Sequence, residues 1–294
     1  MNQILFSVIV PHANSLDTLA RAINSVPDVA YIEVIVVDNS PHPIKKNDVR
    51  DTIRDFRLIY SMPERGAGGA RNEGIRASSG DYLVFLDSDD FFSKDSIILF
   101  DKFKNLEKKP DIAFFDVSAV DSLSLLPVKR ANYYNRLIAA YLDNPSNINK
   151  NRLLFRFCTP WCKFYKSEMI KANNIKFDEV PASNDVMFTE YASSHAIEIS
   201  VFDKVLYYVT ARQNSLTRTP SSKNLRSRFE VQMRQTVFLR SIGKEQYANI
   251  PFTILKQLWK SGLSDFCWGV AGLFKYKVNP FKLIFLKLKY KTYG

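Results

Sequence analysis

The sequence is poor in the residues from which disulfide frameworks and zinc sites are built. Its 294 residues include only three cysteines, Cys158, Cys162 and Cys267, and three histidines. Three cysteines form no disulfide framework, and no histidine lies near enough in sequence to complete a zinc site. Cys158 and Cys162 are four residues apart without a ligand partner, so we expect both to pack in the interior. A reducing cytoplasm is the simplest setting for such a chain.

Long apolar runs are also missing. No segment reaches the roughly 20 apolar residues that cross a bilayer as a helix. The start of the chain has neither a basic region nor a long apolar region, and residues 4–10 are too short for a signal peptide, so they predict a strand. With 46% apolar and 24% charged residues, the chain has the composition of a globular protein. Its length suits one large α/β domain, alone or with an appendage.

Negative charge is scarce toward the C-terminus. The formal net charge is +11, and residues 256–294 carry eight lysines and one aspartate, a net of +7, among nine aromatic residues. One helical face there is apolar, formed by Leu263, Phe266, Cys267, Val270 and Phe274. Lysine beside aromatic residues favours contact with an anionic membrane. A helix that docks on the domain gives the same pattern. No recognition motif for nucleic acid accompanies the basic surface, so we expect no nucleic-acid partner.

Strand and helix patterns alternate over the first 120 residues. Short apolar runs predict buried strands at 4–10, 34–37, 58–60, 82–86 and 112–115. Helical patterns lie between them, after Leu16 and at 47–56, 70–77 and 94–106. Alternation with this period predicts an α/β fold with a mostly parallel, Rossmann-like central sheet flanked by helices.

The apolar run at residues 82–90, YLVFLDSDD, ends abruptly in carboxylates. Asp87 and Asp89 come directly after this buried strand, with Asp90 beside them, and open α/β sheets place ligands at the carboxyl ends of their strands. Carboxylate oxygens are natural ligands of Mg²⁺ or Mn²⁺, which bind through one or two carboxylates plus substrate phosphates. The alternative is a solvated turn, in which these side chains bond local backbone N–H groups ahead of the next helix.

Three further features converge on the same edge of the predicted sheet. Pro11 and Asp38 end the first two strands, so in a parallel sheet they lie on the same side as Asp87. Asp38 can accept a hydrogen bond from a base imide or a ribose hydroxyl. The glycine turn at 66–69 permits close backbone approach, and Arg71 offers a bidentate donor to phosphate.

Six segments in order along the chain resemble the family 2 glycosyltransferases. They are FSVIVPHANS, IEVIVVDNS, RGAGGARNEGIRASSGDYLVFLDSDDFF, WCKFYKSEMIKANNIKFDE, NDVMFTEYA and RQNSLT, and they cover roughly residues 4–218. The resemblance implies the GT-A fold and a nucleoside-diphosphate-sugar donor. It also implies a divalent metal, Mn²⁺ or Mg²⁺, at the Asp-x-Asp motif, here Asp87-Ser88-Asp89. Asp89 is the more direct ligand and Asp87 the second.

The resemblance also places residues around the nucleotide. These are Pro11, Asp38, Asn39, Arg71, Asp87 and Ser88. Asn39 departs from the family, which often has a second aspartate there in contact with the base. An amide can still bond a pyrimidine, but it donates as well as accepts. A UDP-sugar is the first choice of donor, with dTDP- and GDP-sugars as alternatives.

The catalytic base that the resemblance implies is Asp185. The family supplies it from a Glu-Asp pair, which here reads Asn184-Asp185. An inverting displacement needs one carboxylate to take the proton from the acceptor hydroxyl, while a metal neutralises the leaving diphosphate. Taken alone, Asp185 equally suits the N-cap of a helix, and Asp178 or Glu179 is a nearby carboxylate that could carry the role instead.

Several residues outside these motifs have two interpretations. Trp161 is either a platform on which an acceptor sugar stacks or a buried core residue. We expect His12 and His195 to be structural. The resemblance places Arg212 and Asn214, in the RQNSLT segment, near the diphosphate.

The predicted organisation has three parts. Residues 1–120 form the nucleotide-sugar-binding half and 121–220, loop-rich with some helix, the acceptor-binding half of the same domain. Residues 221–294 form a basic, aromatic, helical extension that associates with a membrane, and 223–240 has helical spacing.

Together these features predict an inverting, metal-dependent hexosyl- or N-acetylhexosaminyltransferase. It moves a sugar to a hydroxyl of a bacterial surface glycan, carried on a lipid at the inner face of the cell membrane, where the protein is a cytoplasmic, peripheral enzyme. One rival is a nucleotidyltransferase of sugar phosphates, which usually needs a glycine-rich, basic loop after the first strand, where this chain has PHANSLD. The other is a non-catalytic module that binds sugar nucleotides.

Overall fold

The computed structural model describes residues 3–14, 16–129, 131–211 and 221–290. Over these residues the strands are β1 (Phe6–His12), β2 (Ile32–Asp38), β3 (Arg57–Tyr60), β4 (Tyr82–Phe85), β5 (Phe91–Phe92), β6 (Ile112–Asp121), β7 (Lys163–Lys166) and β8 (Ile199–Ala211). The helices are α1 (Leu16–Asn24), α2 (Gly66–Ala77), α3 (Ser96–Lys104), α4 (Asn132–Asp143), α5 (Asn147–Arg156), α6 (Ser167–Ala172), α7 (Val186–His195), α8 (Ser222–Ser241), α9 (Phe252–Ser261), α10 (Leu263–Lys275) and α11 (Pro280–Lys289). Three 3₁₀ turns are η1 (Lys46–Asp48), η2 (Pro63–Arg65) and η3 (Glu245–Tyr247).

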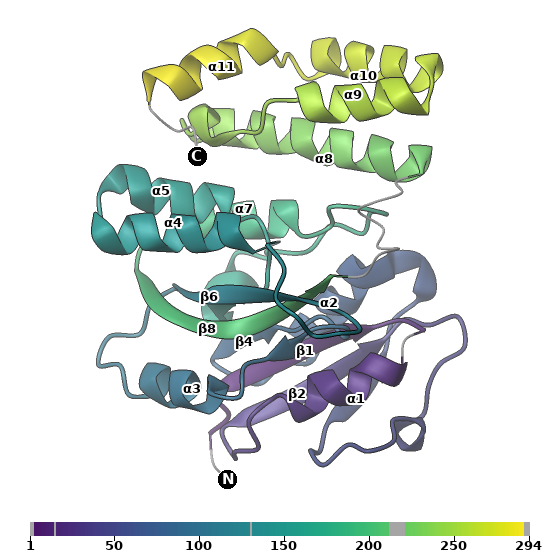
Figure 1. Cartoon of the computed structure of the whole chain (residues 1–294), viewed down its shortest axis with the longest axis vertical. Helices are drawn as coiled ribbons and strands as arrows, with labels where there is room; N and C mark the ends of the chain where they lie inside the picture. Colours follow the sequence, from purple (N-terminus) through teal and green to yellow (C-terminus); the bar gives the residue numbers. More distant parts are fainter. Residues whose placement is uncertain (1–2, 15, 130, 212–220, 291–294) are drawn as a thin grey trace.

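One sheet runs in the order β3-β2-β1-β4-β7-β6-β8-β5. β1 pairs in parallel with β2 and β4, and β2 pairs in parallel with β3. β7 is antiparallel to both β4 and β6, while β6 and β8 are parallel. In Figure 1 the sheet occupies the lower half of the molecule, α4, α5 and α7 lie above it, and α8 to α11 form a layer at the top. The prediction of a mostly parallel α/β sheet with C-terminal helices is confirmed.

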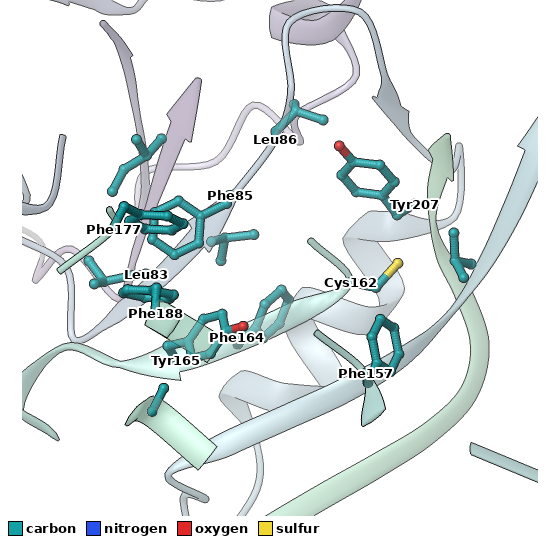
Figure 2. Packing of buried hydrophobic residues seen from close by; sticks show 14 of the residues in the cluster. Leu83, Phe85, Leu86, Phe157, Cys162, Phe164, Tyr165, Phe177, Phe188 and Tyr207 are labelled. Carbon is teal, nitrogen blue, oxygen red and sulfur yellow. The ribbon is translucent and has the colours of Figure 1, made fainter. Parts of the chain in front are cut away.

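Aromatic rings fill the core between β4, β7 and α7. Phe85 of β4 contacts Phe177 and Phe188 at ring-centroid distances of 5.0 and 5.4 Å. The rings of Phe177 and Phe188 stack at 3.9 Å with an interplanar angle of 9°, and Tyr165 of β7 packs on Phe188 at 5.3 Å. Figure 2 shows these rings beneath the end of β4. Stacked and edge-to-face rings pack densely with defined geometry, so these rings hold the C-terminal end of β4 in a fixed position.

Two predicted helices differ from the structure. Residues 47–56 form only the turn η1 followed by irregular chain, because Asp51 adopts a left-handed φ of 60° and the Arg54 guanidinium is drawn inward to Pro27 O and Ile32 O. The other, α2, begins at Gly66 rather than after the glycines. Gly68 lies inside α2, where a Cβ atom would come within 2.0 Å of Asp178 O. The glycines therefore serve close packing of α2 on the segment before α7. The span 121–160 is more helical than predicted, since it contains α4 and α5.

The apolar face predicted for residues 263–274 is only partly covered: Phe266 and Val270 are half-buried, whereas Leu263, Cys267 and Phe274 are exposed. Leu263 and Phe274 are 66% and 79% exposed. α10 instead docks through its small residues: a Cβ atom at Gly269 would lie 2.7 Å from Leu258, and one at Gly272 would lie 2.4 Å from Phe229. No helix in the described part of the chain is long and apolar enough to cross a bilayer.

Candidate active site

The acidic turn after β4 lies at the carboxyl end of the parallel strands, as predicted. Asp87, Ser88 and Asp89 are half-buried there, while Asp90 is only 4% exposed. β4 pairs with β1, which pairs with β2, so these carboxylates lie on the same edge as Pro11 and Asp38. The turn is closed by a hydrogen bond from Asp90 N to Asp87 O of 3.0 Å.

Asp90 connects the acidic turn to β8. Its carboxylate accepts hydrogen bonds from Tyr207 Oη (2.9 Å) and Thr210 N (2.7 Å). The same Tyr207 hydroxyl accepts a bond of 3.0 Å from Asp87 N. Burial raises the pKa of Asp90, and the negative charges of Asp89 and Asp87 add to the rise. The Asp90 carboxylate therefore bonds across to β8 and does not cap the helix that follows. Asp90 supports the turn from beneath.

Arg71 links the acidic turn to the segment that carries Asp185. It lies on α2, is 7% exposed, and donates to Asp87 Oδ1 at 2.6 Å and to Asn184 Oδ1 at 2.9 Å. Its guanidinium also lies over the Phe177 ring at 5.3 Å. These charge-assisted bonds on a buried side chain are of the strong class. Arg71 thus joins Asp87, a predicted site residue, to Asn184, the neighbour of the predicted base Asp185, although the two are far apart in sequence.

Asp185 occupies the N-cap position of α7, but its side chain makes no capping hydrogen bond. The N-cap interpretation therefore accounts for its position in the chain but not for its carboxylate. Burial raises the pKa of Asp185, and the positive charge of Arg71 opposes the rise. A carboxylate with a raised pKa beside a buried cation is typical of functional sites.

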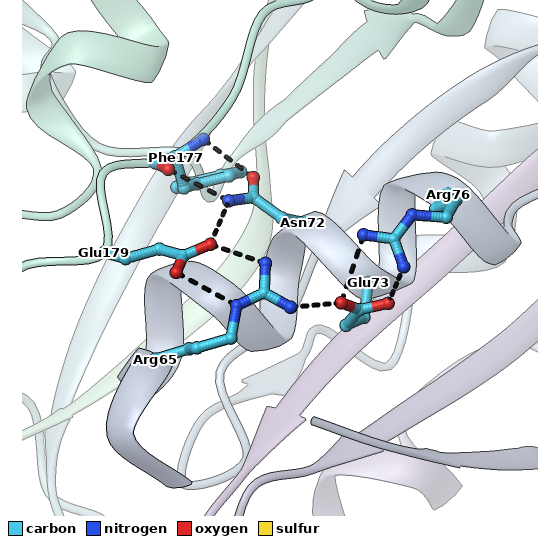
Figure 3. A network of polar contacts seen from close by, with 6 residues as sticks. All are labelled: Arg65, Asn72, Glu73, Arg76, Phe177 and Glu179. Carbon is cyan, nitrogen blue, oxygen red and sulfur yellow. Dashed lines mark hydrogen bonds and ion pairs between the residues drawn. The ribbon is translucent and has the colours of Figure 1, made fainter. Parts of the chain in front are cut away.

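Asp178 and Glu179, the two carboxylates that sequence reasoning left as alternatives, are held in ion pairs. Asp178 accepts both guanidinium nitrogens of Arg234, at 2.9 and 3.0 Å. Glu179 accepts two bonds from Arg65, which lowers its pKa. Figure 3 shows the network around Arg65, which ends η2 just before α2. Of the three carboxylates, Asp185 is the one that has no arginine ion pair within the described part of the chain, and it makes no capping bond on α7.

Asp38 is buried and organises the loop after β2. Its carboxylate accepts bonds from Ser40 Oγ (2.6 Å), Ile44 N (2.9 Å) and His12 Nδ1 (3.0 Å). Burial opposes ionisation, but these bonds outweigh it and lower the pKa of Asp38. Asn39 is 7% exposed beside it. His12 therefore helps to hold the Asp38 carboxylate in place, in keeping with the structural role predicted for it.

Trp161 stacks on the tyrosine that supports the acidic turn. Its ring lies 5.5 Å from that of Tyr207 at an angle of 20°, and 5.1 Å from Tyr134 at 83°. The side chain is half-buried, so it packs on the core and still presents part of its ring. His195 is exposed at the end of α7. Arg212 and Asn214 lie outside the described residues.

Sequence reasoning missed Tyr207, Thr210 and Arg21, which all act on the acidic turn. Arg21 of α1 donates to Asp89 O at 2.6 Å, and Thr210 Oγ1 donates to the same oxygen at 2.9 Å. These residues lie 68 to 121 positions from the turn. Tyr207 lies in an apolar strand, where a tyrosine reads as core, so no local pattern indicated its role.

The acidic turn has the donor set that a divalent cation needs. Asp87 and Asp89 offer half-exposed carboxylates, and Asp90 is committed to β8. Over the described residues no group of three or more His, Cys, Asp and Glu side chains could hold a metal by itself. A cation here would therefore need substrate phosphates beside one or two carboxylates, which is how Mg²⁺ and Mn²⁺ usually bind.

Open α/β sheets bind ligands at the carboxyl ends of their strands, where this chain has its acidic turn and Arg71, and solved structures share the fold. Residues 1–349 of Staphylococcus aureus TarS superpose with a TM-score of 0.62 at 24% identity, covering 83% of this chain and 69% of that one. The UDP complex of the same protein gives 0.67 at 22% identity, covering 93% and 80%, and its UDP-GlcNAc complex gives 0.65.

The model of glycosyl transferase family 2 matches residues 7–172, more than half of the chain. The chain belongs to this family, which confirms the resemblance seen in the sequence. One relative is S. aureus TarS, a poly(ribitol-phosphate) beta-N-acetylglucosaminyltransferase, 28% identical over 71% of this chain and 36% of TarS. Streptococcus pneumoniae glycosyltransferase GlyA is 24% identical over 81% and 35%. The chain thus spans about a third of the length of these two relatives.

A third relative is similar over nearly its whole length. The Escherichia coli protein WfaP, named as a UDP-Glc:alpha-D-GlcNAc-diphosphoundecaprenol beta-1,3-glucosyltransferase, is 26% identical over 84% of this chain and 90% of WfaP.

Proposed function

We propose that this protein is an inverting glycosyltransferase that moves one sugar from a nucleoside diphosphate to a hydroxyl of a glycan acceptor in polysaccharide synthesis. The observation that carries the proposal is the position of Arg71, which bonds both Asp87 and Asn184. Arg71 thereby brings the acidic turn, which suits a diphosphate, beside the segment that carries Asp185, which suits a base. Displacement at an anomeric carbon needs a group that stabilises the leaving diphosphate and a base for the acceptor hydroxyl.

UDP is the favoured nucleotide of the donor. Two supports are the TarS structures with UDP and with UDP-GlcNAc, and the name of WfaP, which gives UDP-glucose as its donor. In this chain Asn39 offers an amide beside the buried Asp38, and an amide pairs with the donor and acceptor groups of a pyrimidine. Asp38 acts indirectly, since its carboxylate already accepts bonds from Ser40, Ile44 and His12.

Asp87 and Asp89 would hold Mn²⁺ or Mg²⁺ together with the diphosphate. When bound, such a cation supplies Lewis-acid neutralisation of the leaving diphosphate. Arg71 adds a fixed positive charge next to Asp87, and Tyr207 and Arg21 keep the backbone of the turn in place through Asp87 N and Asp89 O.

Asp185 is the general base in this proposal. Its carboxylate is not used for capping, and its pKa is raised by burial, so it accepts a proton more readily than an exposed aspartate. A base within reach of the acceptor hydroxyl contributes roughly 10² to 10⁴ in rate. Trp161, half-buried at the side of Tyr207, would present its ring to the acceptor sugar.

The acceptor is carried on a lipid, and the C-terminal helices bind an anionic membrane surface. Their outer side carries exposed apolar residues, namely Phe252, Trp259, Leu263, Phe274, Phe281, Phe285 and Leu288. Exposed lysines lie among them, at Lys256, Lys260, Lys275, Lys282 and Lys289. The one acidic residue of α9 to α11, Asp265, is buried against Arg226 of α8. The diphosphoundecaprenol acceptor in the name of WfaP supports this part of the proposal.

A donor panel tests the function. Purified protein with Mn²⁺ is incubated with UDP-, dTDP- and GDP-sugars and lipid-diphosphate-linked acceptors, and products are identified by mass spectrometry. The proposal requires a glycosylated acceptor and free nucleoside diphosphate. Pyrophosphate release from a nucleoside triphosphate and a sugar phosphate would instead establish a nucleotidyltransferase. Calorimetric binding without turnover of any donor would establish a non-catalytic module.

A further inference from the structure

The segment 178–190, here called the base segment, carries Asp185 and lies against α8. α8 is the long C-terminal helix that runs above α7 in Figure 1. Because Asp185 makes no capping bond of its own, the position of its carboxylate depends on what holds the base segment. Three side chains of α8 bond this segment at three separate points.

The first two contacts hold the chain before α7. Ser227 Oγ donates to Ala182 O at 2.9 Å and accepts from Ala182 N at 3.3 Å. One hydroxyl therefore satisfies both backbone hydrogen-bonding groups of Ala182. Arg234 makes two parallel bonds to Asp178. A bidentate arginine-carboxylate pair fixes orientation as well as distance.

The third contact holds α7 itself. Gln235 Nε2 donates to Glu190 Oε1 at 2.5 Å, and both side chains are 1% exposed. Glu190 lies on α7 five residues after Asp185, and Cys158 Sγ also lies 3.5 Å from Glu190 Oε1. Breaking a buried polar pair of this kind costs free energy, because each group would be left without this hydrogen bond and without water to replace it.

α2 holds the other side of the base segment. Asn72 exchanges two bonds, of 2.8 and 3.0 Å, with the backbone of Phe177, the residue just before the base segment. Arg65, the residue just before α2, pairs with Glu179, as Figure 3 shows. Arg71 then reaches Asn184 from the same helix. The base segment therefore lies between α2, in the predicted nucleotide-binding half, and α8, in the C-terminal extension, and side chains from both sides bond it.

We propose that α8 is a positioning element for catalysis: Ser227, Arg234 and Gln235 set the placement of the Asp185 carboxylate. This inference rests on the proposed function, in which Asp185 is the base. The C-terminal extension would then have two functions, contact with a membrane and positioning of the base. A displacement of about 1 Å at a reacting group costs on the order of 100-fold in rate, so small shifts of the base segment are enough to be measured.

The test compares matched variants on one helix. Arg234→Met and Gln235→Met remove the bonds from α8 to Asp178 and to Glu190. Arg240→Met and Gln232→Met are the controls, because Arg240 pairs with Glu245 and Gln232 with Asn249, both outside the base segment. Arg234→Lys keeps the charge and serves as the conservative rescue. Transfer is measured with a water-soluble acceptor, so that membrane binding does not enter, and hydrogen exchange is followed over 178–190 without substrate.

We expect the two test variants to lose about 10- to 100-fold in kcat, with donor KM within twofold of wild type and faster exchange in the base segment. The controls should match wild type, and Arg234→Lys should recover part of kcat. Combined with Asp185→Asn, neither test variant should reduce kcat further, since it acts through Asp185.

Retention of kcat in both test variants, or a loss that multiplies with that of Asp185→Asn, would overturn the inference while leaving the function intact. A wild-type protein that turns over no donor would remove the proposed function, and unchanged exchange over 178–190 would then also remove the positioning role. Global unfolding temperatures separate these results from a variant that fails to fold.

Discussion

Nη2 of Arg71 lies 2.6 Å from Asp87 Oδ1, in an ion pair whose arginine side chain is 8% exposed and whose aspartate side chain is 28% exposed. The cation is thus fixed and desolvated, while the carboxylate keeps an open side. An open carboxylate beside a fixed cation is suited to a ligand that brings both negative charge and a metal, as a nucleoside diphosphate does.

Replacement of Arg71 by methionine should lower kcat/KM for the donor by at least about 100-fold, because loss of one partner of a buried pair leaves the other charge uncompensated. Both the donor affinity and kcat should fall, since Arg71 bonds Asp87 and Asn184. Arg76→Met is the control: it lies on α2 but is exposed and pairs with Glu73. Steady-state kinetics of the two variants decide the matter, and equal effects would refute the bridging role.

Asp89→Ala should abolish the dependence of donor binding on Mn²⁺, because it removes the carboxylate expected to contact the cation most directly. Titration calorimetry of the nucleotide with and without Mn²⁺ measures this difference. Asp81→Ala is the matched control, since Asp81 is an exposed aspartate that immediately precedes β4, at the end opposite the acidic turn. Metal-dependent binding that survived in Asp89→Ala would place the cation elsewhere.

Asp185→Asn should bind the donor normally and lose transfer by about 10² to 10⁴. In the wild type the acid limb of the kcat profile should lie above the range of an ordinary aspartate, because burial raises the pKa of Asp185. A base works unprotonated, so kcat falls as the pH drops through this raised pKa. Arg71 opposes the rise, so Arg71→Met should move the acid limb to still higher pH. An acid limb that did not move would contradict this assignment.

Tyr207→Phe removes the hydroxyl that bonds both Asp87 N and Asp90 Oδ2. Each group left without a partner in the interior costs about 1 to 3 kcal/mol, so the free energy of unfolding should fall by that order. Metal-dependent donor binding should weaken with it. Tyr208→Phe, one residue along β8 and half-buried, should change neither. Denaturant unfolding and calorimetry on the pair check both effects.

Serine at Trp259, Phe274 and Phe281 should reduce binding to anionic vesicles several-fold, because all three side chains are exposed among lysines and add apolar contact to charge attraction. Transfer to a water-soluble acceptor should stay within twofold. Serine at Ile53 and Leu123, which are 86% and 91% exposed on other parts of the molecule, is the control. Vesicle co-sedimentation that was equal for both sets would rule out this surface as the membrane contact.

Local patterns were sufficient for much of the fold and for half of the site. Strands β1, β2 and β4 are apolar runs, and their parallel pairing brings Pro11, Asp38 and the acidic turn after β4 to one edge. The helix expected at 47–56 failed, because Arg54 satisfies backbone carbonyls of a neighbouring loop instead of continuing a helix. Residues 66–69 were interpreted as a turn, whereas they form the start of α2, in which Gly68 allows a close approach to Asp178.

The sequence by itself determined the family, the mostly parallel sheet and the placement of the acidic motif at a strand end, because these follow from periodicity and from order along the chain. Only the tertiary structure decided that Tyr207 supports this motif, that Arg71 joins it to Asn184, and that α8 holds the base segment. It also decided that α10 docks through Gly269 and Gly272 and leaves Leu263 and Phe274 of its apolar face exposed. Contacts between residues a hundred positions apart leave no periodic trace in the chain, since they depend on how helices and strands pack and not on what either one contains.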